Sequence, residues 1–570
     1  MLDVPRYYPA LELETIPRMF IKAAGKFKDK ELYFMERGNT KQQFNYAEGL
    51  TRVRNLAASL RKIGAKPDSK IAVIGDNCPD WEITYLAIQW AGATVVPLDR
   101  MLKMTEIRHI LENSDSIAVI ATAEYVEIVD EALSGVKRKF TKISIYENKQ
   151  SKEWLPFDRL VSEGSKLDAP EPPENLDSVA AILYTSGTTG QAKGVMLTHR
   201  NIASNISGLY ECFGFDSSDV FVSILPLHHS FEATCGFLCA VVVGAKIAFS
   251  PSLKSKDIID TLGKHGATIV LGVPLLYEKM AEGVMRNVKS SSALKRLVFN
   301  TGMGLGKVSK GISKAMFSSV RKALGMQNVR YLVAGGAALV PWVGSFMERL
   351  GLPIFQGYGM TEASPVIAVS RGKVMDIASV GPMLPGFEDV KIDDPDENGN
   401  GEIMVKGPSV MKGYYKNPEA TAAVLSEDGW LRTGDLGKLD KRGFLYITGR
   451  AKNMIVTAAG KNVYPEEIEA VVGKNPYISE IIVYGHRNEA TEREEIHAVI
   501  VPNYELIDQT KPGVSEEQLE EMMKTEVFKE CEKLADYKRI KHFEIHAEEL
   551  PKTTTNKVKR YLFAKKPIRV

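Results

Sequence analysis

Cysteine is scarce in this sequence, which has only five cysteines among 570 residues. They are scattered too widely for a disulfide framework or a zinc-binding pattern, so we expect a reducing, cytoplasmic environment. Cys235 and Cys239 lie four positions apart inside an apolar run, and packing in a core is the predicted role for both.

Long hydrophobic runs are also missing. The longest, residues 237–245, is about half as long as a membrane-spanning helix. The first nine residues contain an early acid and two prolines but no apolar segment of the kind found in signal peptides. The sequence therefore predicts a chain that is not integral to a membrane.

Neither sign of charge dominates, because the formal net charge is only +2. This excludes a strong overall attraction to nucleic acid. One stretch is an exception: residues 283–347 contain no Asp or Glu but ten Lys or Arg. A solvated face is the plain interpretation, and peripheral contact with an anionic membrane is the alternative.

Helical and strand-like segments alternate in the first part of the chain. Residues 82–91 have helical character and are followed by a strand at 94–98. The unit then repeats, with a helix at 106–112 and a strand at 116–121. Alternation of this kind predicts an α/β fold with doubly wound sheets.

The expected secondary structure changes towards the C-terminus. From about residue 381 to 449, short strands and dense turns predict a small β-rich subdomain. The last 120 residues are predicted to form a compact α+β unit. In it, a helix is expected at residues 465–472, whose first turn contains a proline and acidic residues. Ser515 and Gln518 have the spacing of a capping box.

Residues 184–199 restrict the chemistry most sharply. Directly after the apolar run 179–184, which predicts a buried strand, the ten residues 185–194 hold three glycines, a lysine and several hydroxyl side chains. Glycines let a backbone approach a ligand, while hydroxyls, backbone N–H groups and a lysine donate to anionic oxygens. A polyphosphate site is the prediction, and a flexible polar linker is the alternative. The spacing does not match G-x-x-x-x-G-K-[ST].

Two later segments have the chemistry to complete such a site. Residues 356–362 follow an expected strand at 353–355 and offer a flat ring at Tyr358, a hydroxyl at Thr361 and a hard carboxylate at Glu362. Residues 428–435 end in Asp435, whose carboxylate can accept both hydroxyls of a ribose, and Arg450 follows as a donor.

Together these segments resemble the motifs of the adenylate-forming superfamily, which includes acyl-CoA synthetases, luciferases and adenylation domains. The segment 428–435 is similar to the signature of long-chain fatty acyl-CoA synthetases in particular. The motifs occur in the family's order from Tyr184 to Lys557. The resemblance implies a large N-terminal domain at 1–449, a hinge at 450–452 and a mobile C-terminal domain at 453–570.

The resemblance also implies roles for the site residues. The ATP phosphates would be bound by Thr185, Ser186, Gly187, Thr188, Thr189, Gly190 and Lys193. The adenine and ribose would be bound by Gly335, Gly336, Ala337, Tyr358, Gly359, Thr361, Asp435 and Arg450. Thr185 and Glu362 would hold Mg²⁺ and, with Lys557, form the catalytic set.

Further positions follow from the same resemblance. Lys452 corresponds to the hinge, and Gly460 to the glycine that leaves a path for the pantetheine arm of CoA. Lys557 is the candidate catalytic lysine, although Asn556 stands where many members have glycine. His228 and His229, in a segment resembling the acyl pocket and thiol entrance, are candidates for a gate or a base, and packing is the alternative for both.

The sequence thus predicts an AMP-forming ligase that joins a medium- to long-chain fatty acid to CoA, with ATP and Mg²⁺. The segment 225–232 lacks the aspartate with which amino-acid-activating domains hold an ammonium group, which disfavours an amino-acid substrate. One rival is a ligase that loads a carrier protein's phosphopantetheine. The other is a nucleotide-binding scaffold without catalysis, whose mark would be loss of Glu362 or Lys557. The oligomeric state is open, with a homodimer among the options.

Overall fold

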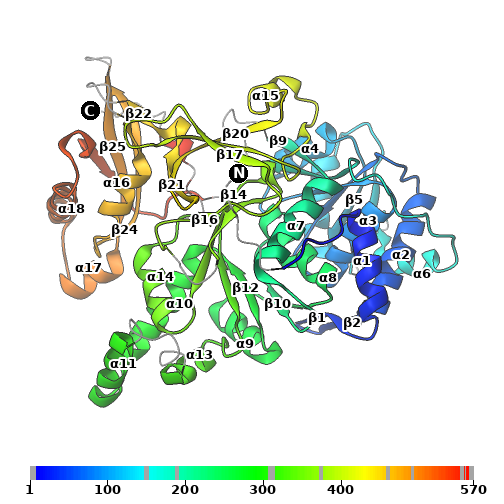
Figure 1. Ribbon diagram of the computed structural model, residues 1–570, viewed down its shortest axis with the longest axis horizontal. Coiled ribbons are helices and arrows are strands. Elements are labelled where there is room, and N and C mark those ends of the chain that lie inside the picture. Colours follow the sequence, from blue (N-terminus) through cyan, green and yellow to red (C-terminus); the bar gives the residue numbers. More distant parts are fainter. Residues whose placement is uncertain are drawn as a thin grey trace. The chain divides into compact units, whose positions relative to one another are not determined.

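The computed structural model describes residues 8–146, 153–185, 192–305, 315–371, 376–456, 462–488, 493–552, 558 and 560–563. The chain divides into two compact units, each described by itself (Figure 1). The first contains residues 1–390 and 405–431, and the second contains residues 391–404 and 432–570.

One eight-stranded sheet of the first unit carries the 184–199 segment. Its strands in spatial order are β19 (Gly413–Tyr414), β9 (Lys193–Thr198), β8 (Val179–Thr185), β4 (Thr94–Pro97), β3 (Lys70–Ile74), β5 (Ser116–Thr122), β6 (Thr141–Ile145) and β7 (Leu155–Pro156). The strands from β8 to β7 run parallel, whereas β9 is antiparallel to both β8 and β19.

Helices surround this sheet: α1 (Ile16–Phe27), α2 (Tyr46–Lys62), α3 (Pro79–Trp90), α4 (Met104–Asn113), α5 (Val126–Leu133), α6 (Phe157–Gly164) and α7 (His199–Phe213). Every residue of α3 is buried, so this helix lies inside the unit and needs no polar face. The hydroxyl of Thr198 caps α7 by accepting from the Asn201 amide, and the Asn201 side chain accepts from the amide of Thr198 in return.

The second eight-stranded sheet also lies in the first unit. Its order is β15 (Val366–Val369), β14 (Ile354–Gly359), β13 (Tyr331–Ala334), β12 (Ile269–Gly272), β10 (Val220–Ser223), β11 (Lys246–Phe249), β1 (Glu31–Arg37) and β2 (Thr40–Asn45). Its helices are α8 (Cys239–Val243), α9 (Ser255–His265), α10 (Pro274–Lys289), α11 (Ala293–Leu305), α13 (Ser318–Ala323) and α14 (Pro341–Arg349), with a π-helical segment η2 (Glu232–Leu238).

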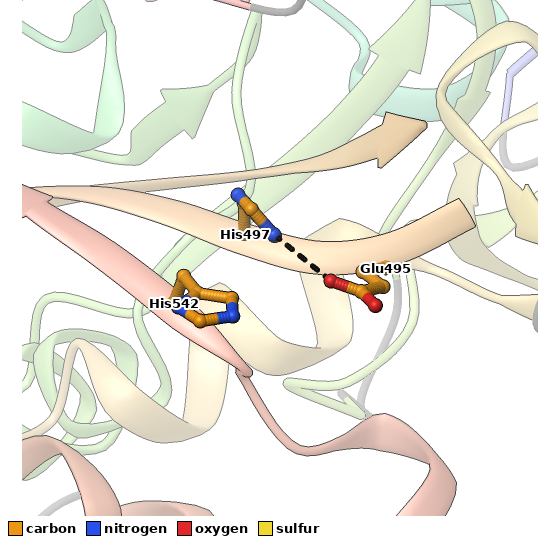
Figure 2. Close-up of side chains that lie close together, drawn as sticks. All are labelled: Glu495, His497 and His542. Carbon is orange, nitrogen blue, oxygen red and sulfur yellow. Dashed lines mark ion pairs between the residues drawn. The ribbon is translucent and has the colours of Figure 1, made fainter. Parts of the chain in front are cut away.

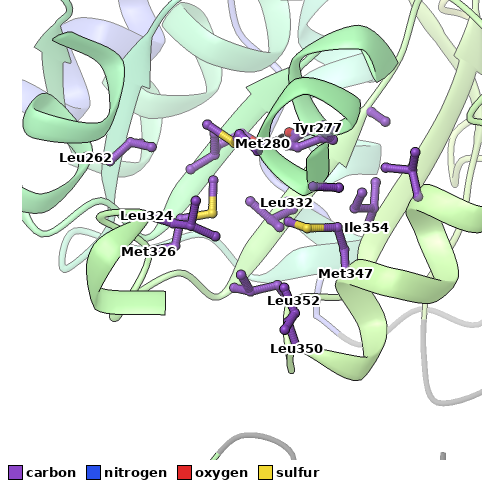
Figure 3. Close-up of a cluster of buried hydrophobic side chains, with 14 of the residues drawn as sticks. Leu262, Tyr277, Met280, Leu324, Met326, Leu332, Met347, Leu350, Leu352 and Ile354 are labelled. Atoms are coloured by element: carbon purple, nitrogen blue, oxygen red, sulfur yellow. Dashed lines mark hydrogen bonds between the residues drawn. The ribbon is translucent and has the colours of Figure 1, made fainter. Parts of the chain in front are cut away.

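A large apolar core holds these helices to the second sheet (Figure 3). Leu332 and Ile354 of the central strands pack with Tyr277 and Met280 of α10 and Met347 of α14. Burying a side chain of this size stabilises the fold by roughly 1.5–3 kcal/mol relative to leaving it in water. The core fixes the strand ends from which the candidate site is built.

The second unit begins with β-structure formed mainly by β17 (Asp389–Asp393), β18 (Gly401–Lys406), β20 (Trp430–Leu439) and β21 (Phe444–Arg450). A hairpin of β22 (Ile455–Val456) and β23 (Asn462–Val463) follows. The C-terminal part contains α16 (Pro465–Val472), β24 (Ile478–Asn488), β25 (Arg493–Pro502), α17 (Tyr504–Thr510), α18 (Glu516–Cys531) and β26 (His542–Ile545).

The remaining described elements are short. They are η1 (Ala123–Tyr125), η3 (Thr361–Ala363), β16 (Gly381–Pro382), α15 (Pro418–Ala422), η4 (Ala451–Asn453), η5 (Asp536–Lys538) and η6 (Arg560–Leu562).

The predicted α/β class is confirmed, with mixed sheets in a large N-terminal part and a smaller C-terminal part. The buried positions of Cys235 and Cys239 and the capping box of Ser515 and Gln518 are also as expected. Among the described residues, no helix is both long and apolar enough to cross a membrane.

One strand boundary differs from the predicted one. The strand expected at 353–355 continues as β14 to Gly359, because its glycine-containing end pairs with β15, where Tyr358 faces Ala368. By their contacts, residues 432–449 group with the C-terminal part. The predicted domains at 1–449 and 453–570 stay predictions. The hinge itself stays a prediction.

Candidate active site

The predicted phosphate loop lies between strands β8 and β9. Strands β8 and β9 pair antiparallel, and Thr185 at the end of β8 lies opposite Lys193 at the start of β9. The pairing therefore anchors both ends of the predicted phosphate loop. Five of its predicted ligands lie outside the described residues: Ser186, Gly187, Thr188, Thr189 and Gly190.

Tyr414 connects this strand pair to the predicted metal ligand. The two-residue strand β19 pairs with β9, with Tyr414 opposite Val195. The Nζ atom of Lys193 lies 5.1 Å from the centroid of the Tyr414 ring. On its other side, the Tyr414 hydroxyl donates to Oε1 of Glu362 over 2.8 Å. One phenol thus contacts both the lysine of the loop and the carboxylate.

Sequence reasoning missed Tyr414. It lies 52 residues after Glu362 and more than two hundred after the loop, and a two-residue strand leaves no periodic pattern. Burial, followed by the charge of Glu362, raises the pKa of Tyr414. The phenol therefore stays protonated and remains a hydrogen-bond donor to the carboxylate at neutral pH.

Glu362 lies in a short turn, η3, that is held from several directions. Its side chain is buried, and its carbonyl accepts a hydrogen bond of 2.8 Å from the Met411 amide. Asn205 of α7 donates to the carbonyls of Ala363 and Val366, at 3.2 and 2.9 Å. A buried carboxylate needs such fixed surroundings, and its hard oxygens are the ligand type that Mg²⁺ prefers.

The predicted adenine-binding segments lie at neighbouring strand ends. Strands β13 and β14 run parallel, with Ala334 opposite Gln356, so Gly335, Gly336 and Ala337 follow β13 beside Tyr358 and Gly359. At Gly335 an added Cβ would lie 3.0 Å from the Phe231 ring, and at Gly359 it would lie 1.9 Å from the Pro365 carbonyl oxygen. Both glycines therefore allow close approaches that a side chain would block.

The histidine segment reaches the same region of the first unit. Ser230 and Thr361 share a hydrogen bond of 3.3 Å between their hydroxyls. His229 Nδ1 accepts from the Phe231 amide at 3.3 Å. His228 Nε2 lies 3.5 Å from Oδ1 of Asp99, and burial lowers its pKa to about 4 in spite of that carboxylate. His228 is therefore neutral near pH 7.

In the second unit, Asp435 and Arg450 are cross-strand neighbours on β20 and β21. Arg450 Nε lies 2.7 Å from Oδ1 of Asp435, whose side chain is buried while Arg450 is partly exposed. The pair thus offers an oriented carboxylate beside a cation, and its role in binding a ribose stays a prediction. Lys452 is exposed in η4. Gly460 and Lys557 lie outside the described residues.

The arrangement can bind a polyanion at the β8–β9 pair and a cation at Glu362. Thr185 and Lys193 border the loop, and Tyr414 contacts both Lys193 and the buried carboxylate of Glu362. The glycine-containing ends of β13 and β14 lie in the same unit. Glu362 and Thr185 fit a magnesium ion by donor chemistry, since both offer hard oxygen atoms.

Known proteins are similar to this chain over most of its length. A chloroplastic long-chain-fatty-acid–[acyl-carrier-protein] ligase of Arabidopsis thaliana is 28% identical, over 91% of this chain and 80% of its own. A peroxisomal long chain acyl-CoA synthetase of the same plant is 32% identical, over 77% of this chain and 66% of its own. ATP-bound MatB from Rhodopseudomonas palustris superposes with a TM-score of 0.76 at 25% identity, covering 96% of this chain and 98% of its own.

Two family models also match. Residues 20–415 match the AMP-binding enzyme model, and residues 467–557 match the AMP-binding enzyme C-terminal domain model. The first match alone covers more than half of the chain. This protein therefore belongs to the AMP-binding enzymes, the adenylate-forming superfamily that its motifs resemble.

Proposed function

We propose that this protein is an AMP-forming fatty acid:CoA ligase acting on medium- to long-chain acids. The observation that carries the proposal is the position of Tyr414 between Lys193 and Glu362, because it joins the phosphate loop to a carboxylate suited to Mg²⁺. Relatives named as long-chain fatty acid ligases support the acyl class.

In the first half-reaction, a carboxylate oxygen of the fatty acid attacks the α-phosphorus of ATP. The bond to the β-phosphate breaks and pyrophosphate leaves. Thr185 and Lys193, together with Ser186, Thr188 and Thr189, hold the β- and γ-phosphates. Glu362 and Thr185 would hold Mg²⁺, which would supply positive charge to offset that of the phosphates. Lys557 offsets charge at the carboxylate and the α-phosphate, the kind of contact whose loss costs roughly 10² to 10³ in rate.

The motif match assigns nucleoside-binding residues in each of the two units. Tyr358 stacks on the adenine, with Gly335, Gly336 and Ala337 on its other side, while Thr361 meets the α-phosphate. Asp435 accepts from the ribose hydroxyls, and Arg450 fixes the orientation of that carboxylate. These roles are proposals that rest on the motif match and on the local geometry of each unit.

In the second half-reaction, the CoA sulfur attacks the acyl carbon. The acyl C–O bond breaks, and AMP leaves with the former carboxylate oxygen. We propose that rotation at Lys452 withdraws Lys557 and opens a path for the pantetheine arm past Gly460. His228 suits a gate better than a base, because a group with a pKa of about 4 has little driving force for accepting a proton near pH 7.

A carrier protein is the alternative acyl acceptor. The relative that is 28% identical over 91% of this chain is named for acyl-carrier-protein ligation. Pyrophosphate release across a panel of carboxylic acids tests the adenylation, and thioester formation with CoA or with a phosphopantetheine carrier separates the two acceptors. Pyrophosphate release with fatty acids and thioester formation with CoA support the proposal. No pyrophosphate release with any acid supports the alternative of a nucleotide-binding scaffold without catalysis.

Peripheral membrane contact is proposed through α11, within the acid-free stretch 283–347. Leu294, Leu297 and Val298 have the spacing of one helix face and are 71%, 64% and 56% exposed. Lys295 and Arg296 lie between Leu294 and Leu297 in the sequence (Figure 1 shows the position of α11). An exposed apolar face beside basic residues suits the interface of an anionic membrane, from which a fatty acid could be taken.

The cellular location and the oligomeric state stay predictions. One relative is named as chloroplastic and another as peroxisomal, so the location differs among relatives. Cytoplasmic location with peripheral membrane contact is our proposal for this chain.

A further inference from the structure

The C-terminal sheet of the second unit has two different faces. Strands β24 and β25 pair antiparallel, and β26 pairs parallel to β25. One face, with Val483, Ala498 and Ile500, packs in the core that includes residues of α16 and α18. Because side chains alternate along a strand, residues 497 and 499 lie on the opposite face.

Three histidines and a glutamate gather at one end of this opposite face. His497 lies opposite His542 in the β25–β26 pairing, and Glu495 is two residues before His497 on the same strand. His486 comes from β24, where it lies opposite Glu495. The four side chains therefore come from three strands: β24 and β25, which are consecutive in sequence, and β26, which comes about forty residues later.

The donor atoms of three of these residues converge (Figure 2). One ligand atom each from Glu495, His497 and His542 can be chosen so that all lie within 4.8 Å of one another. His497 Nε2 lies 3.6 Å from Oε2 of Glu495. The ring of His497 lies 4.9 Å from that of His542 and 4.5 Å, stacked, from that of His486.

His497 is the unusual member of the group. Its side chain is only 4% exposed, and neither of its ring nitrogens has a hydrogen-bond partner within the described part of the chain. A buried imidazole without hydrogen-bond partners is costly, and the nearby carboxylate of Glu495 is 3.6 Å away, beyond hydrogen-bond distance.

We propose that Glu495, His497 and His542 bind one divalent transition-metal ion of the zinc type. Two imidazoles and one carboxylate form a donor set that zinc accepts, with water or His486 as a fourth ligand. Ligand atoms around a tetrahedral zinc lie about 3.3 Å apart, so the observed spacing requires the side chains to close by roughly 1–1.5 Å. The exposed ring of His542 can move to do so.

The role of this ion would be structural. It would join β25 to β26, a four-residue strand that precedes the 550–557 segment in the sequence. Such a site is independent of the proposed ligase function, which uses Mg²⁺ at residues of the first unit. The sequence-based expectation excluded only cysteine-based zinc patterns, so it does not conflict with this site.

The test uses the full chain without an affinity tag, stripped of metal by a chelator and kept in excess Mg²⁺. Titration with Zn²⁺ against a zinc indicator should show one tight equivalent, and Co²⁺ should give the visible absorption of a protein-bound ion. His542→Asn and Glu495→Gln should each weaken binding by more than about tenfold. Both positions are less buried than His497, so these variants preserve the fold better than a change at His497.

The matched control is His546→Asn, one residue beyond β26, where the imidazole Nδ1 is 2.7 Å from the Glu548 carbonyl. It should bind as the wild type does. Zn²⁺ should also raise the melting temperature of the wild type and of the control but not of the two site variants. Absence of a tight equivalent, or equal binding by wild type and site variants, would overturn the proposal.

Discussion

The hydroxyl of Tyr414 donates a hydrogen bond of 2.8 Å to Oε1 of Glu362, and the ring of the same tyrosine lies 5.1 Å from Nζ of Lys193. The two polar partners have different chemistry. Glu362 offers a carboxylate that can bind a cation, whereas Lys193 is itself a cation that can bind phosphates. A neutral phenol between them fixes both without changing the net charge of the site.

Removing this hydroxyl should impair adenylation. Tyr414→Phe keeps the ring beside Lys193 but loses the bond to Glu362, and a hydrogen bond to a charged group is worth about 1.5–3 kcal/mol. We expect pyrophosphate release to slow by roughly tenfold to a hundredfold, with a higher half-saturating Mg²⁺ concentration. Tyr415→Phe is the control, since its hydroxyl bonds the exposed Asp115 over 2.9 Å. Equal rates for wild type and Tyr414→Phe would show that the contact is dispensable.

The Asp435–Arg450 pair should govern ATP binding. Asp435→Asn keeps the size of the buried side chain but weakens acceptance from ribose hydroxyls, so we expect the KM for ATP to rise by roughly tenfold or more. Arg450→Gln should have a smaller effect of the same kind, because Arg450 is partly exposed. Arg432→Gln, at a neighbouring and exposed position of β20 that pairs with Glu402, should leave the KM unchanged. An equal KM for ATP in all three variants would show that Asp435 has no special role in ATP binding.

Glu232 predicts a pH dependence of stability. Burial raises its pKa to about 8 from 4.5, and Ser223 donates to its Oε1 over 2.8 Å. Because the pKa of Glu232 is raised in the folded state, its contribution to the free energy of unfolding is fully present below about pH 4.5. That contribution is lost as the pH rises through 8. Between these values this group lowers the free energy of unfolding by up to about 1.4 kcal/mol per pH unit.

Glu232→Gln removes that titration with little change of shape. Urea unfolding at pH 5, 6, 7 and 8 should show a gain in stability of the variant over the wild type that grows as the pH rises. The exposed Glu171→Gln is the control and should show no such trend. A constant difference between Glu232→Gln and wild type at all four pH values would contradict the raised pKa.

The apolar face of α11 predicts membrane binding. Leu297→Glu places a charge in the centre of that face, so sedimentation with anionic vesicles at low salt should fall while pyrophosphate release with a soluble short acid is unchanged. Leu253→Glu, at another leucine that is 57% exposed, is the matched control and should sediment as wild type does. Sedimentation that Leu297→Glu leaves unaffected would remove α11 from the proposal.

The sequence predicted the elements whose signals are local. The apolar run before the loop gave β8, the alternation around residues 82–121 gave α3, β4, α4 and β5, and the serine and glutamine spacing gave the cap of α18. Each of these depends on residues within about one turn or one strand of each other, which is the range over which periodicity and capping act.

Features that depend on distant pairing were missed. Tyr414 reaches Glu362 only because β19 pairs with β9, and β14 extends to Gly359 only because β15 pairs with it. The cluster of Glu495, His497 and His542 forms through the register of β25 and β26, which no local pattern reveals. Long-range strand pairing overrides local propensity in such places.

The most direct test of the ligase is the fate of a carboxylate oxygen. The enzyme is incubated with a long-chain fatty acid labelled with oxygen-18 in its carboxyl group, together with ATP, Mg²⁺ and CoA, and the AMP is analysed by mass spectrometry. Because the carboxylate attacks the α-phosphorus and AMP later leaves with that oxygen, we predict one labelled oxygen per AMP and acyl-CoA in equal amount. AMP without label, or nucleotide product recovered as ADP, would contradict the account.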